Sequence, residues 1–191
     1  EEVGVKLDSK GFIETNAQYA TTVESIYAIG DCIGAPLLAH VASLEGIKAA
    51  EAIAIHDKKE KLHYEPINYD LVPGCTYCHP EVASFGMTEE KAKAAGVKFK
   101  IGRFPFSASG RAQALGDASG FIKVIAEEEH GEILGAHIIG TNASEIISEL
   151  VIAANTELTI HNIAQIIHAH PTLSEGMMEA CADVLGEAIN I

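Results

Sequence analysis

An α+β fold, in which helices cover an antiparallel sheet, is predicted by three features of this 191-residue chain. Short strand patterns come first and helical patterns follow, an order typical of helices gathered on one face of a sheet. Apolar residues make up 48% of the chain, which is enough for a sizeable core. A charged stretch and two prolines, Pro66 and Pro73, separate an amino-terminal piece from this domain. We therefore predict a boundary near residues 62–72, with domains over 1–65 and 66–191.

The amino-terminal piece combines one strand pattern with one helix pattern. Residues 23–29 are apolar and β-branched, and Gly30 follows them, which predicts a buried strand. After a loop at 34–36, residues 37–56 are rich in alanine and repeat apolar residues at helical spacing. We expect this segment to form one helix, and the charged residues 57–61 to follow it in solvent.

The domain that follows mixes strand and helix patterns before it ends in helices. Thr88 and the two acids after it predict the capped start of a short helix that Gly96 ends. His130 and Gly131 predict a hairpin turn between two strands. The expected strands cover 74–77, 82–87, 97–106, 121–126 and 133–139. The expected helices cover 89–95, 143–155, 159–167 and 172–185. A loop that can hold a helical turn covers 107–116.

The composition excludes several classes of function. The chain has 13 Lys and Arg against 27 Asp and Glu, and its net charge of −14 would repel a nucleic-acid backbone. No apolar run reaches the roughly 18 to 20 residues that span a bilayer, and no basic amphipathic stretch suits a membrane surface. The 4 cysteines are too sparse for a disulfide scaffold and are ordinary for a cytosolic protein. We expect neither nucleic-acid nor membrane binding.

The segment 168–175, His-Ala-His-Pro-Thr-Leu-Ser-Glu, carries the most chemical information. Pro171 favours an extended conformation at His170 and stands just ahead of a helix. Thr172 is a candidate N-cap, and Glu175 has the spacing of a capping box. A carboxylate in the first turn can accept the Nδ1 proton of the imidazole and leave Nε2 to exchange a proton near neutral pH. His170 and Glu175 are therefore candidate catalytic residues.

Simpler interpretations of this segment stay open. Glu175 can serve only as a helix cap, and each histidine can be a surface loop residue. A His-x-His pair with another histidine nearby can also bind a metal, with His161, His168 and His170 as ligands. We expect no metal, and elemental analysis of the protein tests that expectation.

These eight residues closely resemble the active-site signature of the pyridine nucleotide–disulfide oxidoreductase family, which is His-Pro-Thr, two residues and Glu. The preceding His-Ala and the internal Leu-Ser are most similar to its dihydrolipoamide dehydrogenase branch. The resemblance implies that His170 is the catalytic acid–base and that Glu175 is its partner. It also implies a homodimer with shared active sites, which oxidises dihydrolipoamide and reduces NAD through FAD and a redox disulfide. Residues 72–86 resemble the start of the family's dimerisation domain.

A second segment resembles the same family. Residues 21–31, Thr-Thr-Val-Glu-Ser-Ile-Tyr-Ala-Ile-Gly-Asp, are similar to its second flavin-binding motif. A glycine permits close approach of the backbone to a ligand, and an acid at the end of a strand can bind a ribityl hydroxyl, although an ordinary turn is the simpler interpretation of Gly-Asp alone. A helix amino terminus suits the pyrimidine edge of the flavin. The FAD contacts that the resemblance implies are Gly30, Asp31, Leu38, Ala39 and His40.

The sequence departs from a whole family subunit in what it lacks. It contains no Gly-x-Gly-x-x-Gly phosphate loop and no redox disulfide of the family's spacing, so we expect a piece of a longer protein. Residues 1–65 would end the FAD-binding and central region, and 66–191 would be the dimerisation domain. Cys75 and Cys78 do not replace the disulfide, because positions three apart on a strand point to opposite faces.

The resemblance also sets expectations about partners and location. The parent enzyme would serve lipoyl domains of 2-oxo acid dehydrogenase complexes or of the glycine cleavage system. It would work in the cytoplasm or, in a eukaryote, in the mitochondrial matrix. Two alternatives stay open. One is a glutathione or mercuric reductase, and the other is a stand-alone dimerisation module that forms a dimer without flavin absorbance or catalysis.

Overall fold

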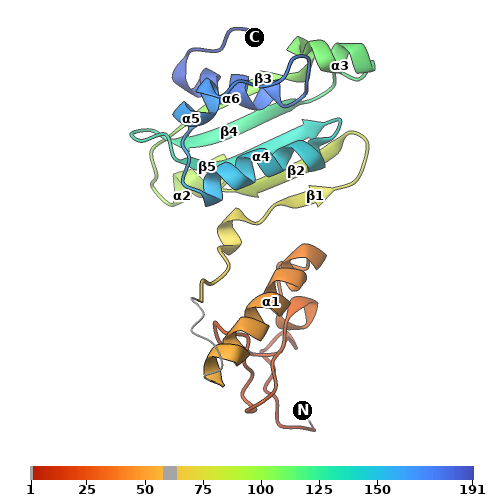
Figure 1. Cartoon of the computed structure of the whole chain (residues 1–191), viewed down its shortest axis with the longest axis vertical. Coiled ribbons are helices and arrows are strands. Elements are labelled where there is room, and N and C mark those ends of the chain that lie inside the picture. Colours follow the sequence, from red (N-terminus) through yellow and green to blue (C-terminus); the bar gives the residue numbers. More distant parts are fainter. Residues whose placement is uncertain (1, 58–63) are drawn as a thin grey trace. The chain divides into compact units, whose positions relative to one another are not determined.

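The computed structural model describes residues 2–57 and 64–191 (Figure 1). The chain divides into two compact units, Glu1–Asn68 and Tyr69–Ile191, which we call unit 1 and unit 2. This division falls inside the stretch 62–72 where the sequence suggested a boundary. The functional assignment of the two domains stays a prediction.

Unit 1 is organised around one long helix. α1 (Ala39–His56) confirms the predicted helix, although it begins slightly later than expected. Its buried face includes Val41, Ala49 and Ala52, and the 3-10 helix η1 (Gly30–Ile33) contacts it. Of the charged stretch expected in solvent, Asp57 is exposed and the remainder lies outside the described residues.

The buried strand predicted over 23–29 is wrong. The described part of unit 1 contains isolated β-bridges but no β-strand. The Thr21 N–H donates to the Ile26 carbonyl at 2.9 Å, so the chain folds back on the residues that precede it. Ser25 takes a left-handed φ of 73°, which turns the backbone inside the segment expected to be straight. The backbone hydrogen bonds are therefore made within a tight turn and not to a neighbouring strand.

Unit 2 is an α+β domain, which confirms the predicted fold class. Its described residues form a five-stranded antiparallel sheet in the order β1-β2-β5-β4-β3. The strands are β1 (Gly74–Thr76), β2 (Glu81–Gly86), β3 (Phe99–Pro105), β4 (Phe121–Glu127) and β5 (Ile133–Gly140). The helices are α2 (Glu89–Ala94), α3 (Gly110–Leu115), α4 (Ala143–Asn155), α5 (Ile160–Gln165) and α6 (Glu175–Leu185), with 3-10 turns η2 (Tyr69–Leu71) and η3 (Phe106–Ala108). Thr88 caps α2 through its side chain, as predicted.

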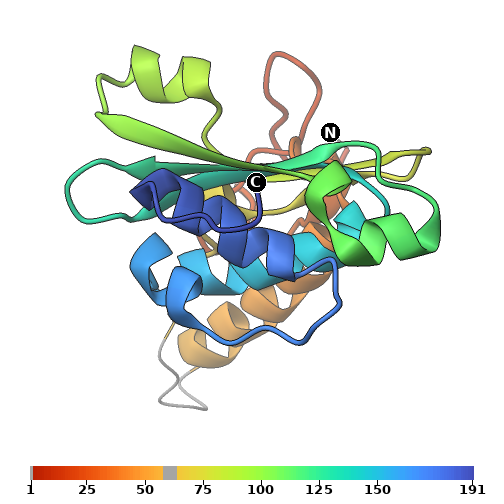
Figure 2. The same cartoon turned by 90° about the horizontal axis from the view of Figure 1, so that it is seen from above.

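Helices α4, α5 and α6 lie on one face of the sheet (Figure 2). α6 packs on β3 and β4, and α4 packs on β2 and β5. The buried core between these layers is largely aliphatic and includes Ile122, Ile138, Ile147, Leu150 and Met177. α6 approaches β3 so closely that a Cβ added at Gly102 would stand 1.9 Å from the Ala180 carbonyl oxygen. This packing fixes the start of α6, where the His-Pro-Thr segment ends.

The connection between α5 and α6 is longer than predicted, because both helices are shorter than expected. Thr172 and Glu175 exchange the two hydrogen bonds of the predicted capping box, yet the helical turns begin only at Glu175. Residues 166–174 therefore form a loop, and this loop carries both His168 and His170.

Candidate active site

The imidazole of His170 and the carboxylate of Glu175 lie together at the start of α6. His170 Nδ1 is 2.8 Å from Glu175 Oε1. An ionised carboxylate only accepts hydrogen bonds, so Nδ1 carries the proton and Nε2 keeps its lone pair when the ring is neutral. The His170 side chain is 77% exposed, which leaves the ring accessible from outside the domain. The structure thus brings the two candidate catalytic residues into contact.

Glu175 is held by hydrogen bonds at both carboxylate oxygens. The Thr172 N–H donates to Oε2 at 2.7 Å, while the His170 ring lies against Oε1. Burial acts against the charged form, but the bonds from Thr172 and His170 and the charge of the nearby histidines hold the pKa of Glu175 below its ordinary value. Glu175 is therefore ionised at neutral pH. It acts both as a cap and as the group that orients the His170 ring.

The other histidine of the loop, His168, is packed inside the domain. Its side chain is 8% exposed, and its Nε2 is 2.7 Å from Glu149 Oε1 on α4. The sequence suggested for His168 only a surface loop position or a metal ligand. Glu149 carried no signal at all, because the contact joins residues 19 positions apart on different elements.

Within residues 2–57 and 64–191, no group of three or more His, Cys, Asp or Glu side chains could hold a metal ion. The cysteines are free thiols, with Cys75 on β1 and Cys78 exposed beyond it. Burial raises the pKa of the Cys181 thiol to about 12, so this thiol stays protonated near neutral pH.

Part of the predicted cofactor site of unit 1 lies on η1. Gly30 has a left-handed φ of 69°, and its N–H donates to the Glu45 carboxylate at 2.6 Å. Glu45 belongs to α1 and is only 3% exposed, so it ties η1 to that helix. The sequence predicted no contact for Glu45. Asp31 is exposed on η1, not at the end of a strand as expected.

The remaining predicted cofactor residues, Leu38, Ala39 and His40, form the amino terminus of α1. Leu38 is the N-cap and makes no side-chain cap hydrogen bond, and the first turn contains no acidic residue. Such a terminus carries a partial positive charge and backbone N–H groups that suit an anionic or electron-rich ring edge. These residues therefore fit the pyrimidine edge of a flavin. They belong to unit 1, whereas the His170–Glu175 pair belongs to unit 2.

The fold and the site of unit 2 define a class of protein: an α+β domain that presents an exposed histidine hydrogen-bonded to a glutamate. The chain belongs to the pyridine nucleotide-disulphide oxidoreductase family. The dimerisation domain of this family matches residues 72–181, and the family description "Pyridine nucleotide-disulphide oxidoreductase" also matches residues 1–46. The resemblance inferred from the two sequence motifs is thereby confirmed.

Several relatives carry the name dihydrolipoyl dehydrogenase. The chain is 46% identical over 192 residues to the protein from Corynebacterium glutamicum, and the match covers 100% of the chain and 40% of the relative. It is 45% identical to the protein from Geobacillus stearothermophilus, covering 100% and 39%. It is 42% identical to dihydrolipoyl dehydrogenase 1, mitochondrial, from Arabidopsis thaliana, covering 100% and 36%. The chain therefore spans about two fifths of the length of these relatives.

Solved structures share the fold. LpdA from Mycobacterium tuberculosis superposes with a TM-score of 0.82 at 26% identity, over 93% of this chain and 38% of that chain. The HOCl-induced flavoprotein disulfide reductase RclA from Escherichia coli gives a TM-score of 0.81 at 22% identity, over 94% and 40%, and shows the fold alone. None of the helices that the structure describes is long and apolar enough to cross a membrane.

Proposed function

We propose that this chain is the carboxy-terminal part of a dihydrolipoyl dehydrogenase and supplies the acid–base pair of its active site. The observation that carries the proposal is the 2.8 Å contact between His170 Nδ1 and Glu175 Oε1 on an exposed ring. Relatives of that name at 42–46% identity support the choice of dihydrolipoamide as substrate. Membership of the pyridine nucleotide-disulphide oxidoreductase family supports NAD as final electron acceptor.

The chemistry of this chain is proton transfer. His170 takes a proton from a thiol of dihydrolipoamide at Nε2, because Nδ1 already donates to Glu175. Glu175 fixes that tautomer and then stabilises the imidazolium that forms. The thiolate, and not the thiol, is the nucleophile that a disulfide requires. FAD, when bound, supplies the electron transfer between this sulfur chemistry and NAD.

Unit 1 supplies flavin contacts in this proposal. The uncapped start of α1 and the left-handed turn at Gly30 support contacts to the ring edge and to the ribityl chain. The residues to which we assign these contacts are Gly30, Asp31, Leu38, Ala39 and His40. Residues 1–65 then end the FAD-binding and central region, and 66–191 form the dimerisation domain.

The match to a dimerisation domain supports a homodimer. We assign to each subunit the role of presenting His170 to the redox disulfide and flavin of its partner, and the 77% exposure of the ring supports this role. Lipoyl domains of 2-oxo acid dehydrogenase complexes or of the glycine cleavage system are the partners that deliver the substrate. The location we assign is the cytoplasm or, in a eukaryote, the mitochondrial matrix; the plant relative is named mitochondrial.

His170→Ala in the complete flavoprotein tests the proposal. We expect dihydrolipoamide oxidation to fall by about 10² to 10⁴, because general acid–base catalysis contributes that much. Flavin absorbance at roughly 450 nm should be kept, since unit 2 makes none of the assigned flavin contacts. His161→Ala is the matched control, because it removes an exposed imidazole of α5. Activity near that of the wild type in His170→Ala would refute the proposed role.

A further inference from the structure

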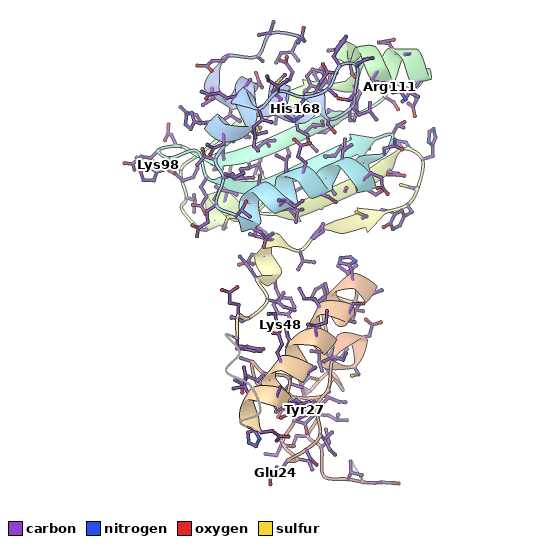
Figure 3. All side chains as sticks on the ribbon, in the orientation of Figure 1. Glu24, Tyr27, Lys48, Lys98, Arg111 and His168 are labelled. Carbon is purple, nitrogen blue, oxygen red and sulfur yellow. The ribbon has the colours of Figure 1, made fainter. Side chains whose placement is uncertain are left out.

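His168 faces hydrogen-bond acceptors at both of its ring nitrogens. It lies in the connection that leads to α6 (Figure 3), with Nδ1 2.8 Å from the Ile166 carbonyl oxygen and Nε2 2.7 Å from Glu149 Oε1. A carbonyl oxygen and an ionised carboxylate can only accept, so each nitrogen must carry a proton. The geometry therefore matches an imidazolium paired with a carboxylate.

The surroundings favour this charged pair. A buried imidazolium needs an opposite charge, and Glu149 supplies one while 32% of its own side chain is still exposed to water. Burial by itself lowers the pKa of His168. The hydrogen bonds to Glu149 and to the Ile166 carbonyl, with the charges of Glu149 and Glu175, raise that pKa above its ordinary value.

The groups around His168 connect it to the candidate active site. Glu149 faces it from α4, and Glu175 acts on it from the start of α6. Cys181 of α6 lies near Glu149 but adds no charge, because burial raises the pKa of its thiol to about 12. In the other direction, the charge of His168 is one of the causes that lower the pKa of Glu175. His170, two residues further along the loop, forms a hydrogen bond with the Glu175 carboxylate.

We propose that His168 is a positioning residue: an imidazolium that anchors the loop to α4 through Glu149 and places a positive charge beside the His170–Glu175 pair. This inference rests on the acid–base role proposed above for that pair. The anchored ring holds the backbone that carries His170. Its positive charge favours the ionised form of Glu175 and opposes a second positive charge on the neighbouring His170 ring.

The protonation of the ring can be observed without any enzyme assay. In the full chain labelled with ¹⁵N at histidine, we expect both ring nitrogens of His168 to give imidazolium signals at about pH 7.5, where an ordinary histidine is mostly neutral. The His168→Gln spectrum assigns these signals by their loss. Glu149→Gln should return the ring to the neutral form. A neutral ring at that pH in the unsubstituted chain would overturn the inference.

The pH dependence of kcat/KM in the complete flavoprotein tests the effect on the pair. His168→Gln can still donate to Glu149 but removes the positive charge. The acid limb of the profile, where kcat/KM falls as the pH is lowered, should therefore move to higher pH by about half a unit. Glu149→Gln should move it in the same direction but less, because a negative charge disappears as well. His161→Gln is the matched control and should not move the limb, and all variants should keep their flavin.

The two proposals fail in distinguishable ways. If the acid limb moves in neither His168→Gln nor Glu149→Gln, the positioning role is overturned, even if activity falls in both variants. A failure of the proposed function appears instead as near-normal activity in His170→Ala, an outcome that leaves the ¹⁵N signals of His168 unchanged.

Discussion

Units 1 and 2 are ordered by different means. Unit 2 buries aliphatic side chains between a sheet and its helices, and many of these side chains are fully buried. In the described part of unit 1, polar side chains organise the backbone locally. Asp8 Oδ1 accepts from the N–H groups of Lys10 and Phe12, and Asn16 Oδ1 accepts from two N–H groups just after it. Order in unit 1 thus depends more on single hydrogen bonds than on layered packing.

This difference shows how each unit supports its part of the proposed chemistry. In unit 2, Glu175 lies in the first turn of a helix that is packed on two strands, and it holds His170 of the preceding loop. In unit 1 the turn at Gly30 is tied to α1 by one buried carboxylate, Glu45. We therefore expect unit 2 to be sensitive to steric changes between its layers, and unit 1 to be sensitive to the loss of one polar contact.

Gly102→Ala should destabilise unit 2, and this is the largest effect that we expect. The added Cβ would stand 1.9 Å from the Ala180 carbonyl oxygen and 2.7 Å from Val184, so β3 and α6 must separate. We expect the free energy of unfolding of unit 2 to fall by about 3 kcal/mol, measured by hydrogen exchange of the β3–β5 amides. Gly110→Ala is the matched control, since a Cβ there meets nothing within 4 Å. Equal protection in the two variants would contradict the steric argument.

Glu45→Ala should loosen unit 1 with an intermediate effect. It removes the acceptor of the Gly30 N–H, and a buried donor without a partner costs about 1–3 kcal/mol. Hydrogen exchange should become faster in α1 and not in the sheet of unit 2, and the complete flavoprotein should retain less FAD. Glu24→Ala, which removes an exposed carboxylate from the same unit, is the control. Unchanged exchange in α1 would show that the contact does not hold the turn.

Asp117→Asn should have the smallest effect, and the effect should depend on pH. Hydrogen bonds from the side chains of Ser119 and Thr141 lower the pKa of Asp117 from 3.8 to about 2. A folded-state pKa below the unfolded value means that the stabilisation is present above about pH 4 and is lost as the pH falls toward 2. The thermal midpoints of variant and wild type should therefore differ at pH 6 and converge as the solution is acidified. Glu128→Gln, which replaces an exposed acid, is the control. A difference in thermal midpoint that stays constant with pH would rule out the lowered pKa of Asp117 as its cause.

Much of unit 2 could be predicted from the sequence because its signals are local and periodic. α4 (Ala143–Asn155) has the predicted bounds, and the hairpin of β4 and β5 follows from its turn residues. The strand expected over 23–29 failed because its β-branched composition does not report the turn at Ser25. The candidate site was found for the same reason as the helices, since His170 and Glu175 are only 5 positions apart.

The sequence by itself determined the family, the fold class of unit 2 and the His170–Glu175 pair, because each depends on residues close together along the chain. Only the tertiary structure decided the contacts of His168 with Glu149 and of Gly30 with Glu45, which span 19 and 15 positions. The physical reason is that these carboxylates meet their partners only after the packing of α4 and α1 has set the distance. A glutamate that will bind a buried partner and one that will face only solvent look the same in the sequence.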